Sequence, residues 1–222
     1  MQVVIFGATG MVGYEVLLRA IERDEITKII TIGRNKTNIN NQKVEEIIHD
    51  DFTNYSSLNS ILQDTDVCYY CLGVYQNAVD KKQFWHITVD YVKALIECFE
   101  QTNPSVNFCL FSAQGAKLDG SSLFRFGNAK GAAEKILLDS QITDKFIFRP
   151  GYINPGKNTN RFSIFEYIFK PLFLIVPFIG INDSDLAKCI VEVGLKKNEK
   201  QILENSDLRK LTAGLNGTSG RT

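Results

Sequence analysis

The glycine-rich stretch at residues 7–13, Gly-Ala-Thr-Gly-Met-Val-Gly, has the residue types and spacing of a turn that binds phosphate. Before it, the apolar run 3–6 predicts a buried strand. After it, Val12, Val16 and Ala20 recur at helical spacing and predict an amphipathic helix. The amides at the start of such a helix, and the positive end of its dipole, attract an anion. We therefore predict that the turn binds the pyrophosphate of a dinucleotide.

The glycines of this turn have separate tasks in that interpretation. Gly7 permits a tight turn at the end of the strand. Gly10 has no side chain, so a pyrophosphate can approach the backbone, and Gly13 lets the helix pack closely on the sheet. The alternative is a turn that is only structural. We expect the cofactor to contact Gly7, Thr9, Gly10, Met11, Val12 and Gly13.

Arg34 follows the next predicted strand, residues 28–33, at the position that faces the adenosine ribose in a dinucleotide fold. An acidic residue here would accept a hydrogen bond from the 2′-hydroxyl of NAD. An arginine is suited to the 2′-phosphate of NADP. The cofactor that we expect is therefore NADP, with NAD as the alternative. Alternatively, Arg34 is an ordinary solvent-exposed arginine in a turn.

Two further strand ends are candidates for cofactor contacts. A strand at 44–49 is followed by Asp51 and Phe52, where a carboxylate and a backbone amide can bind the adenine edge. Alternatively, Asp51 caps the turn that follows. A strand at 67–72 ends in Leu72 and Gly73, and the glycine leaves room for a ligand.

Cys68 and Cys71 form a C-x-x-C motif that invites a redox or metal interpretation. A redox pair is expected at a helix start, whereas these residues fall in a predicted strand. Residues three apart in a strand face opposite sides. We therefore expect core thiols, and we assign no metal site.

The elements alternate between strand and helix. Strands are predicted at 3–6, 28–33, 44–49, 67–72, 106–111 and 145–148, and helices after the glycine turn and at 55–63, 80–101, 128–139 and 183–195. This alternation predicts an α/β protein with a doubly wound parallel sheet, whose ligand lies across the carboxyl ends of the strands. We expect a single domain over 1–214, with cap elements from about 155, and a polar flexible tail over 215–222.

Residues 162–181 are rich in aromatic and aliphatic side chains. Their uncharged run is too short to span a bilayer. Packing in the core or a cap over the substrate is one interpretation. A dimer contact or contact with a membrane surface is the other.

Charge and cysteine usage narrow the classes of function. The formal net charge is zero, which argues against nucleic-acid binding through a basic surface. The cysteine count is odd, at 5, which fits reduced thiols rather than a disulfide framework. We expect no signal peptide. We expect a cytoplasmic protein.

Taken together, these motifs resemble the atypical short-chain dehydrogenase/reductase family, in particular its small NAD(P)-binding group, which includes the Tat-interacting oxidoreductase-like proteins. The likeness extends over nearly the whole chain. It rests on the turn 7–13, Gly33-Arg34, Asp51-Phe52, Cys71-Leu72-Gly73, 112–116 and Phe148-Arg149-Pro150-Gly151. It implies the sheet order 3-2-1-4-5-6 of a Rossmann fold, and cofactor contacts that include Pro150 and Gly151.

In that family a serine, a tyrosine and a lysine carry the redox chemistry. Ser112 and Lys130 match the serine and the lysine, which also holds the cofactor ribose. The tyrosine stands four residues before the lysine, where this chain has Phe126. A phenol exchanges a proton with the substrate while hydride moves to or from the nicotinamide. A phenyl ring cannot do this, and such catalysis contributes about 10²–10⁴-fold in rate.

Three hypotheses follow from this substitution. The first is an NADP-binding protein with weak or absent dehydrogenase activity that acts as a sensor, regulator or assembly factor. The second is an enzyme with another proton donor, Tyr75 or Tyr152, which reduces a carbonyl or acts as an epimerase or a flavin- or quinone-type reductase on an unknown small molecule. The third is a scaffold that binds a protein partner.

Overall fold

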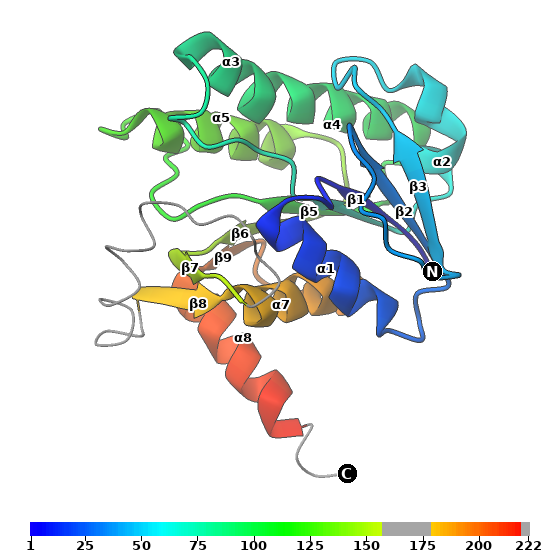
Figure 1. The fold of residues 1–222 in the computed structure, drawn as a ribbon. Coiled ribbons are helices and arrows are strands. Elements are labelled where there is room, and N and C mark those ends of the chain that lie inside the picture. The colour runs from blue at the N-terminus through cyan, green and yellow to red at the C-terminus, as the bar shows by residue number, and fades with distance from the viewer. Residues whose placement is uncertain (157–178, 219–222) are drawn as a thin grey trace.

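A parallel sheet forms the centre of the molecule in the computed structural model, which describes residues 1–156 and 179–218 (Figure 1). Seven strands make up this sheet within the described residues, in the order β3-β2-β1-β4-β5-β6-β9. The strands are β1 (Gln2–Phe6), β2 (Lys28–Gly33), β3 (Val44–Ile48), β4 (Val67–Tyr70), β5 (Asn107–Phe111), β6 (Asp144–Arg149) and β9 (Ile202–Glu204). The predicted order of the first six strands is confirmed, and β9 adds a strand beside β6 that the sequence did not predict.

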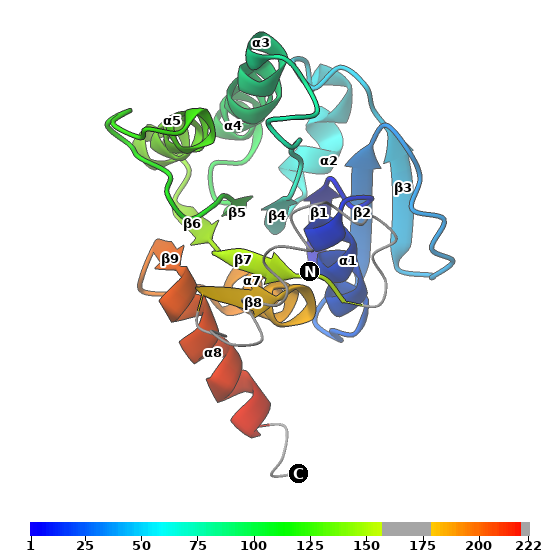
Figure 2. The same cartoon turned by 60° about the vertical axis from the view of Figure 1, so that its left-hand side comes forward.

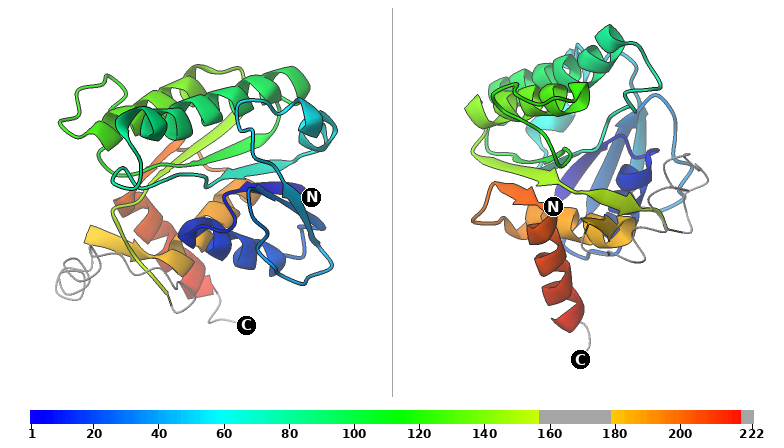
Figure 3. Two further views of the ribbon diagram at one scale, coloured as in Figure 1. Left: turned by 45° about the horizontal axis from the view of Figure 1, so that its top comes forward. Right: turned by 90° about the vertical axis from the view of Figure 1, so that its left-hand side faces the viewer.

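Helices cover both faces of the sheet, as Figure 3 shows from two sides. One layer contains α1 (Met11–Ile21) and α7 (Asp183–Lys196). The other contains η1 (Ser56–Leu58), α2 (Asn59–Gln63), α3 (Lys81–Trp85), η2 (His86–Asp90), α4 (Tyr91–Thr102) and α5 (Arg125–Asp139). Each layer buries its own apolar cluster against the sheet. This is the doubly wound arrangement that the alternating elements predict.

The cysteine pair spans the two faces of the sheet. Cys68 packs in the cluster on the α4 side, whereas Cys71 packs against the cluster on the α1 and α7 side. The two thiols therefore face opposite sides, as their spacing predicts. Cys71 directly follows β4 rather than lying within it, because β4 ends at Tyr70.

The helix predicted over 80–101 is divided by a π-helical turn. Asp80 caps α3 by accepting hydrogen bonds from the amides of Lys82 (2.7 Å) and Gln83 (2.9 Å). The π turn η2 follows, and its His86 is half exposed and pairs with Asp90 at 2.7 Å. A π turn requires one extra residue in the helical repeat, and the apolar periodicity does not reveal it.

The C-terminal third adds a small second sheet and a projecting helix. In the small sheet, β7 (Tyr152–Asn154) pairs in parallel with β8 (Gly180–Asn182). Helix α8 (Asn205–Thr218) extends away from the sheet (Figure 2). The expectation of a flexible tail from residue 215 is therefore wrong for 215–218, which are helical. Residues 219–222 and most of the aromatic segment, 162–178, lie outside the described residues.

In the part of the chain that the structure describes, no helix has the length and apolar character that crossing a membrane requires.

Candidate functional site

The glycine turn leads directly from β1 into α1. Gly7 has a φ of +80°, a backbone conformation that strongly favours glycine. A Cβ on Gly7 would lie 2.7 Å from the amide nitrogen of Leu72. A Cβ on Gly13 would lie 2.2 Å from the carbonyl oxygen of Gly7. The turn therefore packs tightly against both its own helix and the end of β4, and side chains are excluded at both glycines.

The start of α1 is open to a ligand. Gly10 is the N-cap residue, and no side chain caps the helix there. The first helical hydrogen bond runs from the amide of Tyr14 to the carbonyl of Gly10 at 2.9 Å. The amides of Met11, Val12 and Gly13 precede it and have no partner within the helix. They are available to an anion.

Arg34 lies directly after β2, the neighbour of β1 in the sheet. Its side chain is exposed, and no hydrogen bond or ion pair is found for it among the described residues. Lys36 is also exposed. Arg34 therefore follows the strand next to the one that leads into the glycine turn. Its guanidinium has no hydrogen-bond or ion-pair partner within the described part of the chain.

Asp51 and Phe52 follow β3. Asp51 accepts hydrogen bonds from the amide (3.1 Å) and the hydroxyl (2.6 Å) of Thr53, and these bonds hold the pKa of its carboxyl below the usual range. Asp51 therefore caps its own turn, which is one of the two alternatives from the sequence. Phe52 is buried and stacks on Tyr91 at 5.3 Å. Its backbone, not its side chain, is what remains for contact with an adenine.

The end of β4 leaves space beside the turn. Gly73 is exposed, and a Cβ there would meet no described atom within 4 Å. Tyr75, two residues on, is 70% exposed. Val74 and Val79 from the same loop, and Phe126 from α5, all pack against a small apolar cluster of Phe84, Val89 and Ala129.

Helix α5 is close-packed against the segment after β5. A Cβ on Gly131 would lie 1.9 Å from the carbonyl oxygen of Lys117, so only glycine fits there. The ring of Phe126 reaches within 3.7 Å of the position of a Cβ on Gly115. Phe126 and Lys130 are one turn apart, so both project on the same side of α5. The helix begins at Arg125 rather than at Asn128, which places Phe126 in its first turn.

The ammonium of Lys130 points to the end of β5. Its Nζ donates a hydrogen bond to the carbonyl of Phe111 at 3.2 Å and lies 5.6 Å from the centre of the Phe111 ring. Burial lowers the pKa of Lys130 to about 8, although Glu134 and Cys71 act in the opposite direction. The ammonium thus stands at the carboxyl edge, between the ends of β4 and β5.

Ser112 is turned into the protein. It is 1% exposed, and its hydroxyl donates a hydrogen bond to Glu134 of α5, which is completely buried. Arg149 at the end of β6 donates to both oxygens of the same carboxylate. The role of Ser112 in proton transfer stays a prediction. Glu134 is not among the predicted site residues, although its spacing from Lys130 places it on the same helical face.

Pro150 and Gly151 follow β6 and touch the segment after β5. The amide of Gln114 donates to the carbonyl of Pro150 at 2.9 Å. The amide of Gly151 donates to the side-chain oxygen of Asn205 at 3.1 Å. A Cβ on Gly151 would lie 2.9 Å from Oε1 of Gln114, so this exposed amide side chain also stands at the carboxyl edge. Gln114 is not among the predicted site residues.

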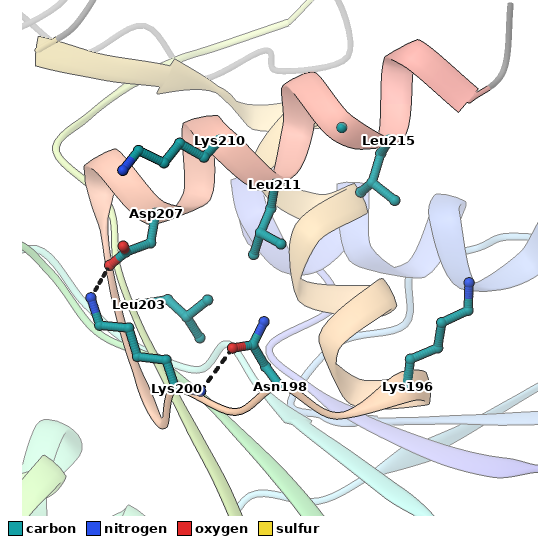
Figure 4. A pocket seen from close by; sticks show the side chains of 9 residues that line it. Lys196, Asn198, Lys200, Leu203, Asp207, Lys210, Leu211 and Leu215 are labelled. Atoms are coloured by element: carbon teal, nitrogen blue, oxygen red, sulfur yellow. Dashed lines mark hydrogen bonds and ion pairs between the residues drawn. The ribbon is translucent and has the colours of Figure 1, made fainter.

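A separate hollow of about 570 Å³ lies between α7, β9 and α8 (Figure 4). Leucine side chains from β9 and α8 point into it, and lysines stand around it. Lys200 pairs with Asp207 at 2.5 Å across one side. None of the predicted site residues lines this hollow. The predicted residues instead gather at the carboxyl edge of the sheet.

Residues 7–193 match the family described as NAD(P)H-binding. The match starts at the glycine turn and extends into α7, which is well over half of the chain. The chain belongs to the NAD(P)H-binding family.

The chain is also similar to individual proteins and solved structures. Protein HTATIP2 of Rattus norvegicus is 27% identical over 161 residues, which are 72% of this chain and 65% of that protein. The Bordetella bronchiseptica enzyme WbmG, solved in complex with NAD, has a TM-score of 0.69 at 12% identity, covering 99% of this chain and 78% of that one. The short-chain dehydrogenase/reductase YIR035C of Saccharomyces cerevisiae has a TM-score of 0.70 at 15% identity, with coverages of 93% and 96%. The chain therefore has the Rossmann-type fold of the short-chain dehydrogenases/reductases.

Proposed function

We propose that the protein binds NADP(H) across the carboxyl edge of the sheet, in preference to NAD(H). The observation that carries the preference is Arg34, which is exposed after β2 and holds no ion pair among the described residues. A 2′-phosphate beside this guanidinium gains a charge-assisted contact worth about 1.5–3 kcal/mol, or roughly a tenfold to hundredfold preference.

The residues at the edge fit a dinucleotide. The start of α1 has no side-chain cap, so its amides can bind the pyrophosphate. Gly73 leaves open space beside the turn. Lys130 presents an ammonium at the same edge, which would hold the hydroxyls of the nicotinamide ribose. When bound, the cofactor supplies or accepts hydride, and the protein supplies binding, orientation and any proton.

The proposed redox activity of the protein as it stands is weak or absent. The resemblance puts Phe126 at the family tyrosine position, and its ring, which packs against the cluster of Phe84, Val89 and Ala129, presents no hydroxyl. The hydroxyl of Ser112, the second member of the expected set, donates a hydrogen bond to Glu134. Cofactor binding does not depend on either group. We therefore favour a sensor, regulator or assembly role that depends on the bound dinucleotide.

One observation favours an alternative in which the protein is an active reductase. Tyr75 is 70% exposed on the loop that follows β4, so a phenol stands after one of the strand ends that form the carboxyl edge. In this alternative Tyr75 donates the proton to a small carbonyl substrate. Tyr75→Phe then abolishes turnover and leaves NADPH affinity unchanged.

Calorimetric titration of wild type and Arg34→Ala with NADPH and NADH tests the proposed function. Wild type should bind NADPH at least about tenfold more tightly than NADH, and the variant should lose most of this preference. Lys28→Ala is the matched control, because Lys28 is exposed at the other end of β2 and the substitution removes the same charge. Equal affinity of wild type for both cofactors, or an unchanged preference in Arg34→Ala, would contradict the proposal.

A further inference from the structure

An ionic cluster, buried at Glu134 and half exposed at Glu204, joins the carboxyl ends of three strands to α5. Arg149 of β6 donates from Nε to both oxygens of Glu134, at 3.0 and 3.1 Å, and from Nη2 to Oε2. Its Nη1 donates to Glu204 of β9 at 2.8 Å. The hydroxyl of Ser112, which follows β5, donates to Glu134 as well. Glu134 therefore accepts hydrogen bonds from both Ser112 and Arg149, and Arg149 links it to Glu204.

The packing of α5 alone does not explain a carboxylate at this position. Glu134 is 0% exposed, and a buried carboxylate is costly unless charges and hydrogen bonds compensate it. An apolar residue at this position would pack against the sheet without that cost. Two carboxylates and one guanidinium also leave the cluster with one negative charge. The nearby ammonium of Lys130 balances it.

Glu134 acts on Lys130 by two routes. The first is mechanical, because Ser112 fixes the end of β5, and the preceding carbonyl of Phe111 accepts the hydrogen bond from Lys130. The second is electrostatic, because Glu134 stands one helical turn after Lys130 on the same face and favours its charged form. Both routes lead to the ammonium that the proposed function places at the ribose.

We propose that Glu134 is a positioning residue that keeps Lys130 charged and aimed at the dinucleotide. The inference rests on the proposed function, in which Lys130 holds the ribose. Glu134 itself contacts no cofactor. It works through Ser112, Arg149 and its own charge.

The groups that face Lys130 define a testable pH dependence. They are the Phe111 carbonyl from β5, the Cys71 thiol after β4, and Glu134 on α5, with Arg149 behind it on β6. Burial lowers the pKa of Lys130 to about 8, and Glu134 limits this fall. Removal of the carboxylate charge therefore moves the loss of the ammonium to a lower pH.

The experiment is an NADPH titration by fluorescence from pH 6 to pH 10, with wild type and Glu134→Gln. We expect wild-type affinity to fall above about pH 8, and the midpoint of that fall to move down by about one pH unit in the variant. At pH 8.5 the variant then binds several-fold more weakly than wild type, and the two converge at low pH. Asp139→Asn is the matched control, because it removes the exposed carboxylate of the Lys135–Asp139 pair on the same helix.

A second variant keeps the proposal testable if Glu134→Gln does not fold. Glu134→Gln leaves Arg149 with one carboxylate fewer, whereas Glu134→Gln combined with Arg149→Met also removes the guanidinium that Glu134 paired with. If a folded variant loses NADPH affinity with the same pH midpoint as wild type, the positioning role is overturned and the proposed function is left intact. Wild-type protein that binds no dinucleotide at any pH overturns the proposed function itself.

Discussion

Substitutions in the glycine turn should separate its structural and binding tasks. A Cβ on Gly13 would stand 2.2 Å from the carbonyl oxygen and 2.8 Å from the carbonyl carbon of Gly7. Both atoms are backbone, so the turn itself must move. Overpacking of this kind costs about 1–3 kcal/mol. We expect Gly13→Ala to lower the free energy of unfolding by that amount.

Gly10 should behave differently. The nearest atom to a Cβ there is the carbonyl oxygen of Gly7 at 3.2 Å, so a shift of a few tenths of an ångström accommodates it. We expect Gly10→Ala to change the free energy of unfolding by about 1 kcal/mol or less. Its methyl group, however, occupies the approach of the pyrophosphate. Loss of one charge-assisted amide contact weakens NADPH binding by about 10–100-fold.

Gly10→Asp adds a negative charge to the added bulk. Two unit charges 4 Å apart repel by about 4 kcal/mol at an effective dielectric constant of 20, which is about three orders of magnitude in affinity. Urea unfolding followed by circular dichroism measures the stability of each variant, and calorimetry measures its binding. If folded Gly10→Asp binds NADPH as wild type does, the cofactor does not lie on this turn.

Three further predictions concern the neighbouring groups. Phe126→Tyr should raise NADPH-dependent reduction of a panel of aldehydes and ketones above that of wild type, whereas Phe124→Tyr, two residues earlier, should not; equal rates in all three proteins would mean that another residue donates the proton. Lys130→Met should unfold at a higher urea concentration than wild type at pH 7, because the folded protein carries a partly buried ammonium there. Because the pKa of Lys130 is lowered to about 8 in the folded protein, wild type regains stability as the pH rises from 8 toward 10.5. The difference in the free energy of unfolding between Lys130→Met and wild type should therefore narrow by about 2 kcal/mol over this range. A difference that does not depend on pH would contradict this. Thiol titration of denatured protein prepared without reductant should find both Cys68 and Cys71 reduced, with no stoichiometric zinc by metal analysis; two missing thiols would show a disulfide.

The sequence predicted the central strands because their runs are long and continuously apolar. The sequence did not predict β9, because Ile202–Glu204 is only three residues long and a run of that length has no detectable hydrophobic periodicity. Helix α8 did carry a signal. Leu208, Leu211 and Leu215 recur at helical spacing after Asn205, but the glycines near the C-terminus favoured a tail.

The candidate site was predictable where the backbone forms it and not where tertiary packing decides it. Gly7 and Gly13 must be glycine for steric reasons, and their spacing in the sequence already indicates this. The orientation of Ser112 does not follow from its place after a strand, because it depends on Glu134 of a distant helix. Asp51 presents the same difficulty, since a carboxylate after a strand serves a ligand or a turn equally well until the position of Thr53 is known.

The most direct measurement is calorimetry of the wild-type protein with NADPH and with NADH under identical conditions. We expect saturable binding of one NADPH per chain, about tenfold or more tighter than binding of NADH. Absence of binding to either cofactor at millimolar concentration, or tighter binding of NADH, would contradict it.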